Sequence, residues 1–595
     1  MGNFFKQIIA SFIGTVIGMV VGLGLFFGAG ALGLALLFMA AASPGEPESQ
    51  DKSILKIDLS LAITDGNRRI GLEESFLGAE RQTISLRTVV DAIESAAKDE
   101  KIVAIYLDGS GSGGGSGLAT LREVRTALEK FRAAGKKIIA YDIDWTKGDY
   151  YLGSVADQVV VDPMGYVEIA GLSYEEMFVS GALSKYGIGV QVVRAGKYKA
   201  AVEPFVAQQM SLENRQQTQL WLNQVWSEFT NTVGKSRKLS PSQLQTWANT
   251  IGSISPESAQ QFRLVDRIAH ADQVEEELRK LTGQTDRPAN KISLRRYAKT
   301  KTTEVVNKPQ KIALVYAQGE ITSESSNSDQ VSSQKLAAQL ESLRQNEDVK
   351  AIVLRVNSPG GGATASEQIL RQVQLTNQKK PVVISMGDYA ASGGYWISAY
   401  GRRIFAEPNT ITGSIGVFGL LFNVGELARQ NGITWDTVKT GSFADAQTIS
   451  RPKTPQELAV YQREVDRIYA KFVAKVAEAR KLSPAKVDEV AQGRVWSGQQ
   501  AKEIGLVDEI GGLGEAIAYA AKAANLGQDW QLIEPDEDLH WPDKLVNIFQ
   551  SKYRQVTADP ITKEIQNLHR QIQILKNLND PQNIYARLPF NLHIK

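Results

Sequence analysis

Ser392 is the residue whose surroundings best fit nucleophilic chemistry. It lies in GDYAASGGYWIS, after a buried strand and among small residues that would let a substrate backbone come close. A serine at a strand-to-helix junction points its hydroxyl at free helix N–H groups, which favour developing negative charge. A simple helix N-cap is the alternative, because serine is common there. The segment is not a GxSxG elbow, since position 390 is alanine.

A serine that attacks an amide needs a base. The chain has no cysteine, and none of its four histidines lies in a glycine-rich or repeated segment, so lysine is the residue type to consider. Lys199, in RAGKYKAAVEPF, has small and apolar neighbours, and burial there would lower the pKa of its ammonium group toward neutrality. Lys147 is the rival base.

Two glycine-rich loops follow predicted strands. The N–H groups of NSPGGG, residues 357–362, would serve as preorganised donors to a carbonyl oxygen, although a tight turn explains the loop as well. The loop DGSGSGGGSG, residues 108–117, formally contains GxGxxG, so a dinucleotide site is a rival interpretation. Its repeat partner SPGGG does not fit that pattern, which disfavours nucleotide binding.

The chain contains an internal duplication, which relates the two candidate residues. Residues 136–163 recur as residues 379–408, and the offset that aligns their final prolines also aligns Tyr150 with Tyr395. In this register Ser392 faces Lys147, and Lys199 faces Ala444. One half therefore holds a candidate nucleophile and the other a candidate base, which indicates one active site divided between two repeats.

Alternating strands and helices must position these residues. Runs such as KIVAIYLD and VKAIVLRVN are continuously apolar and β-branched, as expected of strands buried on both faces, and each enters a glycine-rich loop and then a helix. The pattern predicts α/β repeats with parallel pairing. We expect repeats at residues 52–283 and 309–535, a linker at 284–308, and a helical tail at 536–595 suited to docking or helix pairing.

The composition is that of a globular protein with a distinct N-terminus. The 595 residues carry a net charge of +2, which implies no nucleic-acid partner. No charged residue occurs between Lys6 and Glu46, so residues 1–45 are predicted to be a transmembrane anchor. A cleaved signal peptide is the alternative. One transmembrane span would place the rest of the chain outside the cytoplasm, whereas a hairpin of two spans would leave it in the cytoplasm.

The motifs RVNSPGG, MGDYAASGGYWIS, TGSIGV and YKAAVEPF together resemble those of signal peptide peptidases of the long, duplicated SppA-type family, which are serine proteases with the ClpP/crotonase-like fold. The resemblance implies that Ser392 is the nucleophile and Lys199 the general base. It also implies that Ser414 orients the lysine, and that Gly360 and the N–H of Gly393 form the oxyanion hole.

The sequence thus predicts a membrane-anchored serine endopeptidase that degrades signal-peptide remnants and other apolar peptides, without a metal or cofactor. The resemblance implies a homo-oligomer, which we expect to be a tetramer. We expect an extracytoplasmic catalytic domain and contact with lipid through the N-terminal segment. A crotonase-like acyl-CoA enzyme and a catalytically silent membrane scaffold are the alternatives.

Overall fold

The computed structural model describes residues 51–66, 83–111, 115–301, 308–324, 330–535 and 584–588. The chain divides into two compact units, Met1–Ser49 and Gln50–Lys595, and all the described residues belong to the second. The predicted membrane anchor lies outside the described residues, and so does most of the predicted helical tail. Its described part, residues 584–588, contradicts the prediction, because Ile584–Arg587 form a strand. Within the described ranges, no helix is both long enough and apolar enough to cross a membrane.

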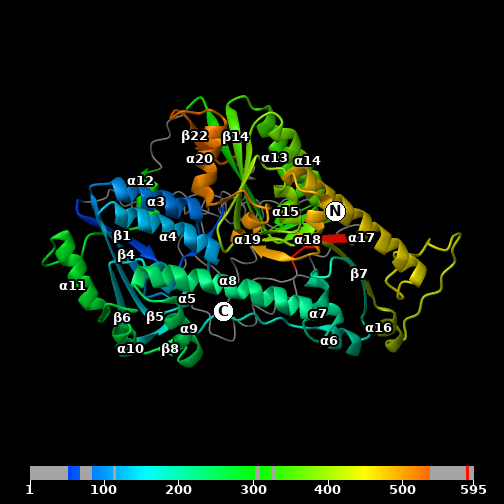
Figure 1. The fold of residues 1–595 in the computed structure, drawn as a ribbon, viewed down its shortest axis with the longest axis horizontal. Coiled ribbons are helices and arrows are strands. Elements are labelled where there is room, and N and C mark those ends of the chain that lie inside the picture. The colour runs from blue at the N-terminus through cyan, green and yellow to red at the C-terminus, as the bar shows by residue number, and fades with distance from the viewer. Residues whose placement is uncertain are drawn as a thin grey trace, which may run out of the picture. The chain divides into compact units, whose positions relative to one another are not determined.

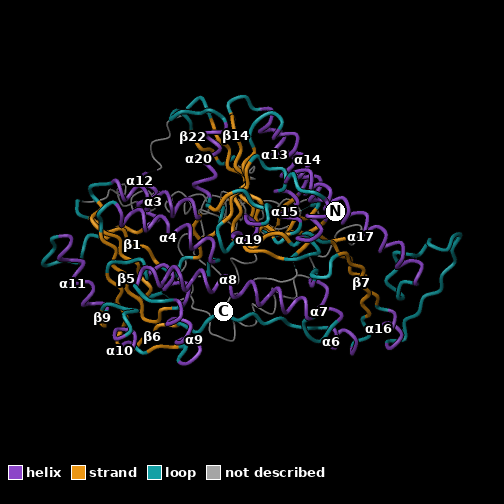
Figure 2. Tube along the Cα trace, viewed as in Figure 1, coloured by secondary structure: helices purple, strands orange, loops and turns teal. Residues whose placement is uncertain are grey.

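The first repeat is built on a seven-stranded sheet, whose strands are orange in Figure 2. Its strand order is β10-β1-β4-β5-β6-β8, and β9 pairs with β6. The ladders between β1, β4, β5 and β6 are parallel, as the buried apolar runs predicted. The elements are β1 (Ser53–Asp58), β4 (Ile102–Gly109), β5 (Lys137–Trp145), β6 (Gln158–Glu168), β8 (Ser253–Ile254), β9 (Arg267–Ile268) and β10 (Lys291–Ser293), with helices α3 (Leu86–Lys98), α4 (Leu118–Ala133), α5 (Lys147–Gly153) and α8 (Leu212–Arg237).

The second repeat has an eight-stranded sheet with the order β20-β18-β16-β14-β11-β22, and β17 joins β16 to β21. Its central ladders β11–β14 and β14–β16 are again parallel. The elements are β11 (Lys311–Gln318), β14 (Val349–Ser358), β16 (Val382–Ala391), β17 (Arg403–Ala406), β18 (Ile411–Gly413), β20 (Val495–Ser497), β21 (Glu509–Ile510) and β22 (Gln531–Ile533), with helices α13 (Ser333–Gln345), α14 (Ala363–Asn377), α15 (Gly393–Ser398), α17 (Pro455–Arg480) and α20 (Leu513–Ala523).

Equivalent residues of the two repeats make equivalent contacts. The hydroxyl of Tyr150 donates to the carbonyl of Leu264 at 2.6 Å, and that of Tyr395 donates to the carbonyl of Leu506 at 2.9 Å. The long helices α8 and α17, both labelled in Figure 1, are each followed by a C-cap lysine with positive φ. Each repeat also joins the arginine of RKLSP to a later aspartate: Arg237 to Asp266 and Arg480 to Asp508. These shared contacts confirm the duplication.

A third sheet combines strands from distant parts of the chain. Its order is β13-β12-β15-β23-β19-β7. Strand β7 (Gly189–Ala195) belongs to the first repeat and pairs with β19 (Val417–Asn423) of the second over its whole length. The other members are β12 (Glu320–Thr322), β13 (Gln330–Ser332), β15 (Gly360–Gly362) and β23 (Ile584–Arg587). This sheet brings the chain just before Lys199 beside the second repeat.

Part of the segment predicted as a linker belongs to the fold of the first repeat. Strand β10 pairs with β1, and helix α12 (Leu294–Lys301) follows it directly. Ile292, Leu294 and Tyr297 are buried there. The segment resembles a linker in composition because basic residues surround these three apolar side chains. The three side chains nevertheless face the core of the first repeat.

A buried cluster of charges joins the two repeats. The Arg355 guanidinium, on β14, pairs with Asp65 at 2.6 Å and with Glu123 at 2.7 Å. All three side chains are buried. Glu123, on α4, also accepts from the N–H of Leu513 at the start of α20. In the other direction, Asp388 of the second repeat accepts from the N–H and hydroxyl of Thr120 at the start of α4.

Candidate active site

Ser392 lies at the junction between strand β16 and helix α15. Its backbone has φ 55° and ψ −111°, a conformation that residues with a side chain seldom adopt. Its N–H donates to the carbonyl of Gly413 at 2.8 Å, and its carbonyl accepts from the N–H of Trp396 at 2.7 Å. The side chain is fully buried but does not cap the helix, so the N-cap alternative does not account for its hydroxyl.

Lys199 reaches this serine from the other repeat. Its Nζ lies 2.7 Å from the Ser392 Oγ, across 193 positions of sequence. The backbone is held in place by a loop of the second repeat, because the N–H of Tyr198 donates to the carbonyl of Gln492 at 2.8 Å. Gly493, at φ +77°, is the next residue of that loop, and a Cβ there would lie 2.6 Å from the backbone nitrogen of Lys199. Gly493 was not predicted as part of the site, because no local pattern in the sequence distinguishes it.

Ser414 completes the surroundings of the lysine amine. Its Oγ lies 3.0 Å and its carbonyl oxygen 3.1 Å from the Lys199 Nζ. A neutral amine has two N–H groups and one lone pair. If both N–H groups donate to Ser414, the lone pair remains for the hydroxyl proton of Ser392. Ser414 has φ 49° and donates its own N–H to the carbonyl of Arg494 at 2.7 Å, which fixes the turn after β18.

The site favours the uncharged form of Lys199. The side chain is fully buried, and in the described part of the chain it forms no ion pair. Burial lowers the pKa of the Lys199 ammonium well below its ordinary value, and the nearby charge of Arg587 lowers it further. A lysine amine in its uncharged form can accept a proton as a general base.

Gly360 and Gly393 face each other beside Ser392. A Cβ on Gly360, at φ +100°, would lie 2.6 Å from the nitrogen of Gly393, and a Cβ on Gly393 would lie 3.0 Å from the Cα of Gly360. Both positions therefore require glycine. The N–H of Gly360 donates to the Ser358 hydroxyl at 3.2 Å, so this N–H already has a partner. The two glycines thus lie side by side next to Ser392, and their role as an oxyanion hole stays a prediction.

Lys147 does not take part in this arrangement. It starts helix α5 of the first repeat, and its ammonium group forms an ion pair with Glu168 there. The site thus brings together Ser392, Lys199, Ser414, Gly360 and Gly393, while Lys147 remains a paired side chain of the first repeat.

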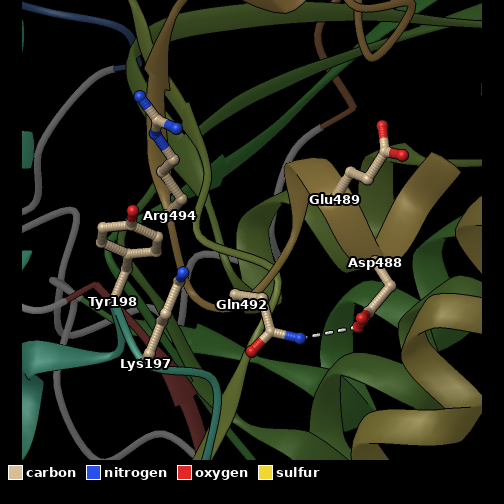
Figure 3. Close-up of a pocket in the computed structure, with 6 residues that line it drawn as sticks. All are labelled: Lys197, Tyr198, Asp488, Glu489, Gln492 and Arg494. Atoms are coloured by element: carbon tan, nitrogen blue, oxygen red, sulfur yellow. Dashed lines mark hydrogen bonds between the residues drawn. The ribbon is translucent and has the colours of Figure 1, made fainter. Parts of the chain in front are cut away.

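A polar pocket lies beside the loop that carries Lys199, since Lys197 and Tyr198 line it. Figure 3 shows its lining residues: Lys197, Tyr198, Asp488, Glu489, Gln492 and Arg494. The Gln492 amide donates to Asp488 at 2.7 Å, and the Arg494 guanidinium lies 5.4 Å from the ring centre of Tyr198. Its charged lining does not suit apolar side chains, and Lys199 is not among its walls.

The sequence was compared with known proteins. The model of peptidase family S49 matches residues 130–285 and 374–527, one stretch in each repeat, and that of Clp protease matches residues 305–412. The chain is 33% identical to Protease 4 of Salmonella typhi over 92% of both chains. It is 31% identical to the chloroplastic serine protease SPPA of Arabidopsis thaliana, over 74% of this chain and 66% of the relative. A putative signal peptide peptidase SppA of Enterococcus faecium is 36% identical over 35% of this chain and 61% of its own.

Proposed function

Because the chain belongs to peptidase family S49 and is a serine protease, we propose that Ser392 is its nucleophile and Lys199 its general base. The observation that carries this proposal is the 2.7 Å approach of the lysine amine to the serine hydroxyl in a buried site. Ser414 is then a positioning residue. It accepts hydrogen bonds from the Lys199 amine and takes no part in the attack of Ser392 on the substrate carbonyl carbon.

The reaction follows from this geometry. The neutral amine of Lys199 takes the proton of Ser392 as the Oγ attacks a peptide carbonyl carbon. The carbonyl oxygen becomes negative in the space between Gly360 and Gly393, where the N–H of Gly393 stabilises it. Lys199 passes its proton to the leaving nitrogen, and the C–N bond breaks. Water activated by the same amine then hydrolyses the ester on Ser392.

The substrates in this proposal are apolar peptides, in particular signal-peptide remnants left in a membrane. The uncharged segment between Lys6 and Glu46 supports attachment to a membrane, and one of the relatives is named as a putative signal peptide peptidase. With one span, the catalytic unit faces away from the cytoplasm. A homo-oligomer, expected to be a tetramer, is part of the same proposal.

The test is hydrolysis of a fluorogenic peptide with an apolar residue before the cleaved bond, by the full chain purified in detergent. We expect Ser392→Ala and Lys199→Ala each to lower kcat by about 10³-fold or more, because the two residues act as a unit. Lys147→Ala is the matched control and should retain the wild-type rate. Activity that survives in Ser392→Ala would contradict the mechanism, and so would equal losses in the three variants.

A further inference from the structure

The side chain of Gln217 joins the two repeats beside the proposed catalytic pair. Gln217 lies near the start of α8, the long helix of the first repeat in Figure 1, and is 2% exposed. Its amide nitrogen donates to the carbonyl of Tyr198 at 3.0 Å. Its amide oxygen accepts from the N–H of Val495, in strand β20 of the second repeat, at 3.4 Å. One buried side chain thus bonds a backbone group of each repeat.

The first of these backbone groups belongs to the residue just before Lys199. The N–H of Tyr198 donates to the carbonyl of Gln492 in the second repeat, and both residues are labelled in Figure 3. The carbonyl of Tyr198 accepts from Gln217 of the first repeat. Lysine has a flexible four-carbon stem, so the place of its amine depends on where its backbone is held. The start of the Lys199 stem is therefore held from both repeats.

The second backbone group belongs to a strand beside the two serines of the site. Val495 lies opposite Gly413 in the ladder between β18 and β20. The carbonyl of Gly413 accepts the N–H of Ser392, and the next residue, Ser414, bonds the lysine amine. A shift of α8 relative to β20 would therefore change the distance between the amine and both serines.

The orientation of the Gln217 amide is fixed by Asn214, one turn earlier on α8. The Asn214 amide nitrogen donates to the carboxylates of Glu176 and Glu203, each at 3.1 Å. Because both of its N–H groups are used, its oxygen is left to accept, and Gln217 donates to it at 3.4 Å. The Gln217 nitrogen therefore faces Asn214 and the Tyr198 carbonyl, and its oxygen faces the second repeat.

We propose that Gln217 is a positioning residue for peptide hydrolysis, which holds the Lys199 amine at the distance from Ser392 that proton transfer requires. The proposal rests on the proposed function, because Gln217 acts only through the proposed base. Its bonds go to the backbone on either side of the site and to Asn214. Without them the amine stays buried but loses its alignment, so the chemical step slows while substrate binding is unchanged.

The first experiment is steady-state hydrolysis of the fluorogenic peptide by the full chain carrying Gln217→Met. Methionine keeps the length of the side chain and removes its hydrogen bonds. The Tyr198 carbonyl keeps its bond from the N–H of Ala200 at 2.9 Å, so it is not left without a partner. We expect kcat to fall by about 30-fold at unchanged KM, because a small misplacement of a catalytic group is costly.

Gln219→Met is the matched control for this variant. Gln219 lies on the same helix, but it is exposed and its amide donates to Asn223 at 2.9 Å. Gln219→Met should therefore keep the wild-type kcat. A wild-type kcat in Gln217→Met, or an equal loss in both variants, would overturn the proposal.

A pH profile separates positioning from an effect on the charge of Lys199. If Gln217 positions the amine, kcat/KM of Gln217→Met should level off at a lower plateau and inflect at the same pH as in the wild type. A wild-type plateau that is reached only at higher pH would overturn the proposal. Such a profile would show that the variant only lets water reach the lysine and so stabilises its charged form.

A second variant, Gln217→Asn, decides the point if Gln217→Met does not fold. Its amide is one methylene nearer the helix and cannot reach both backbone groups at once, so kcat should fall by about threefold or more. A wild-type kcat in this variant would overturn the proposal. Lys199→Ala tests the proposed function separately. A wild-type rate in Lys199→Ala would overturn the proposed base and with it the role of Gln217, whereas losses confined to Lys199→Ala would overturn the role of Gln217 alone.

Discussion

Lys199 must be neutral to accept a proton, and its burial favours the neutral amine. The pKa of its ammonium group lies below its ordinary value, so kcat/KM should rise with pH through this lowered pKa and level off above it. The check is a pH profile of peptide hydrolysis. Lys199→Arg is the control, because a guanidinium stays protonated and high pH should not restore activity. A rate that falls as the pH rises from 5 to 8 would contradict the assignment.

The same burial has a cost in stability. Between the lowered pKa of the folded chain and the ordinary pKa of the unfolded chain, Lys199 binds a proton only when unfolded. Between the folded and unfolded pKa values, the free energy of unfolding should therefore rise with pH by about 1.4 kcal/mol per unit. Lys199→Met should lack this contribution and be more stable than the wild type at pH 7, although inactive. Urea unfolding at pH 7, 8 and 9 compares the two, and identical slopes would show that the folded lysine is charged.

At the scale of elements, the turn from β14 into β15 sets the shape of the cleft. Gly360→Ala should lower kcat by about 10²-fold or more, because a Cβ there collides with the bound carbonyl and strains a backbone at φ +100°. Gly432→Ala is the matched control, since it has φ +74° but open space around its Cα. Gly432→Ala should keep the wild-type kcat. An equal loss of kcat in both variants would show that backbone strain alone causes the effect.

Strand β23 competes with any peptide that adds to β15 and β19. A chain that ends at Asp580 lacks this strand, so its KM for the fluorogenic peptide should fall by about tenfold at unchanged kcat. A chain that ends at Leu588 keeps the strand and serves as the control, with an unchanged KM. Steady-state kinetics of the two chains and the wild type decide the point. A higher KM after removal of the strand would show that it builds the cleft rather than filling it.

Local patterns in the sequence predicted the elements that are repeated or continuously apolar. These patterns located β4, β14 and the junction at Ser392, and the repeat register with the family resemblance identified Lys199. They did not predict the third sheet, because its ladders β7–β19, β15–β23 and β19–β23 join segments far apart in the sequence and β23 has only four residues. Strand β10 and helix α12 were also not predicted, because the basic residues around Ile292, Leu294 and Tyr297 made the segment resemble a linker.

At the scale of the whole molecule, the buried charges between the repeats hold the two halves of the site together. Arg355→Met would leave Asp65 and Glu123 buried without their partner, so we expect a loss of about 3–5 kcal/mol in the free energy of unfolding. Arg467→Met removes an exposed pair with Glu464 and should cost less than about 1 kcal/mol. Denaturant unfolding of both variants is the measurement, and equal losses would show that the cluster does not couple the repeats.

The division of the site also governs when proteolysis begins during synthesis. On the proposed mechanism, a ribosome that has released only the first repeat has made the base, Lys199, but not the nucleophile, Ser392, which comes 193 residues later. The loop around Gly493 that holds Lys199 is made later still. On the proposed mechanism, nascent chains are therefore unable to cut themselves or their neighbours until both repeats have been translated and have docked.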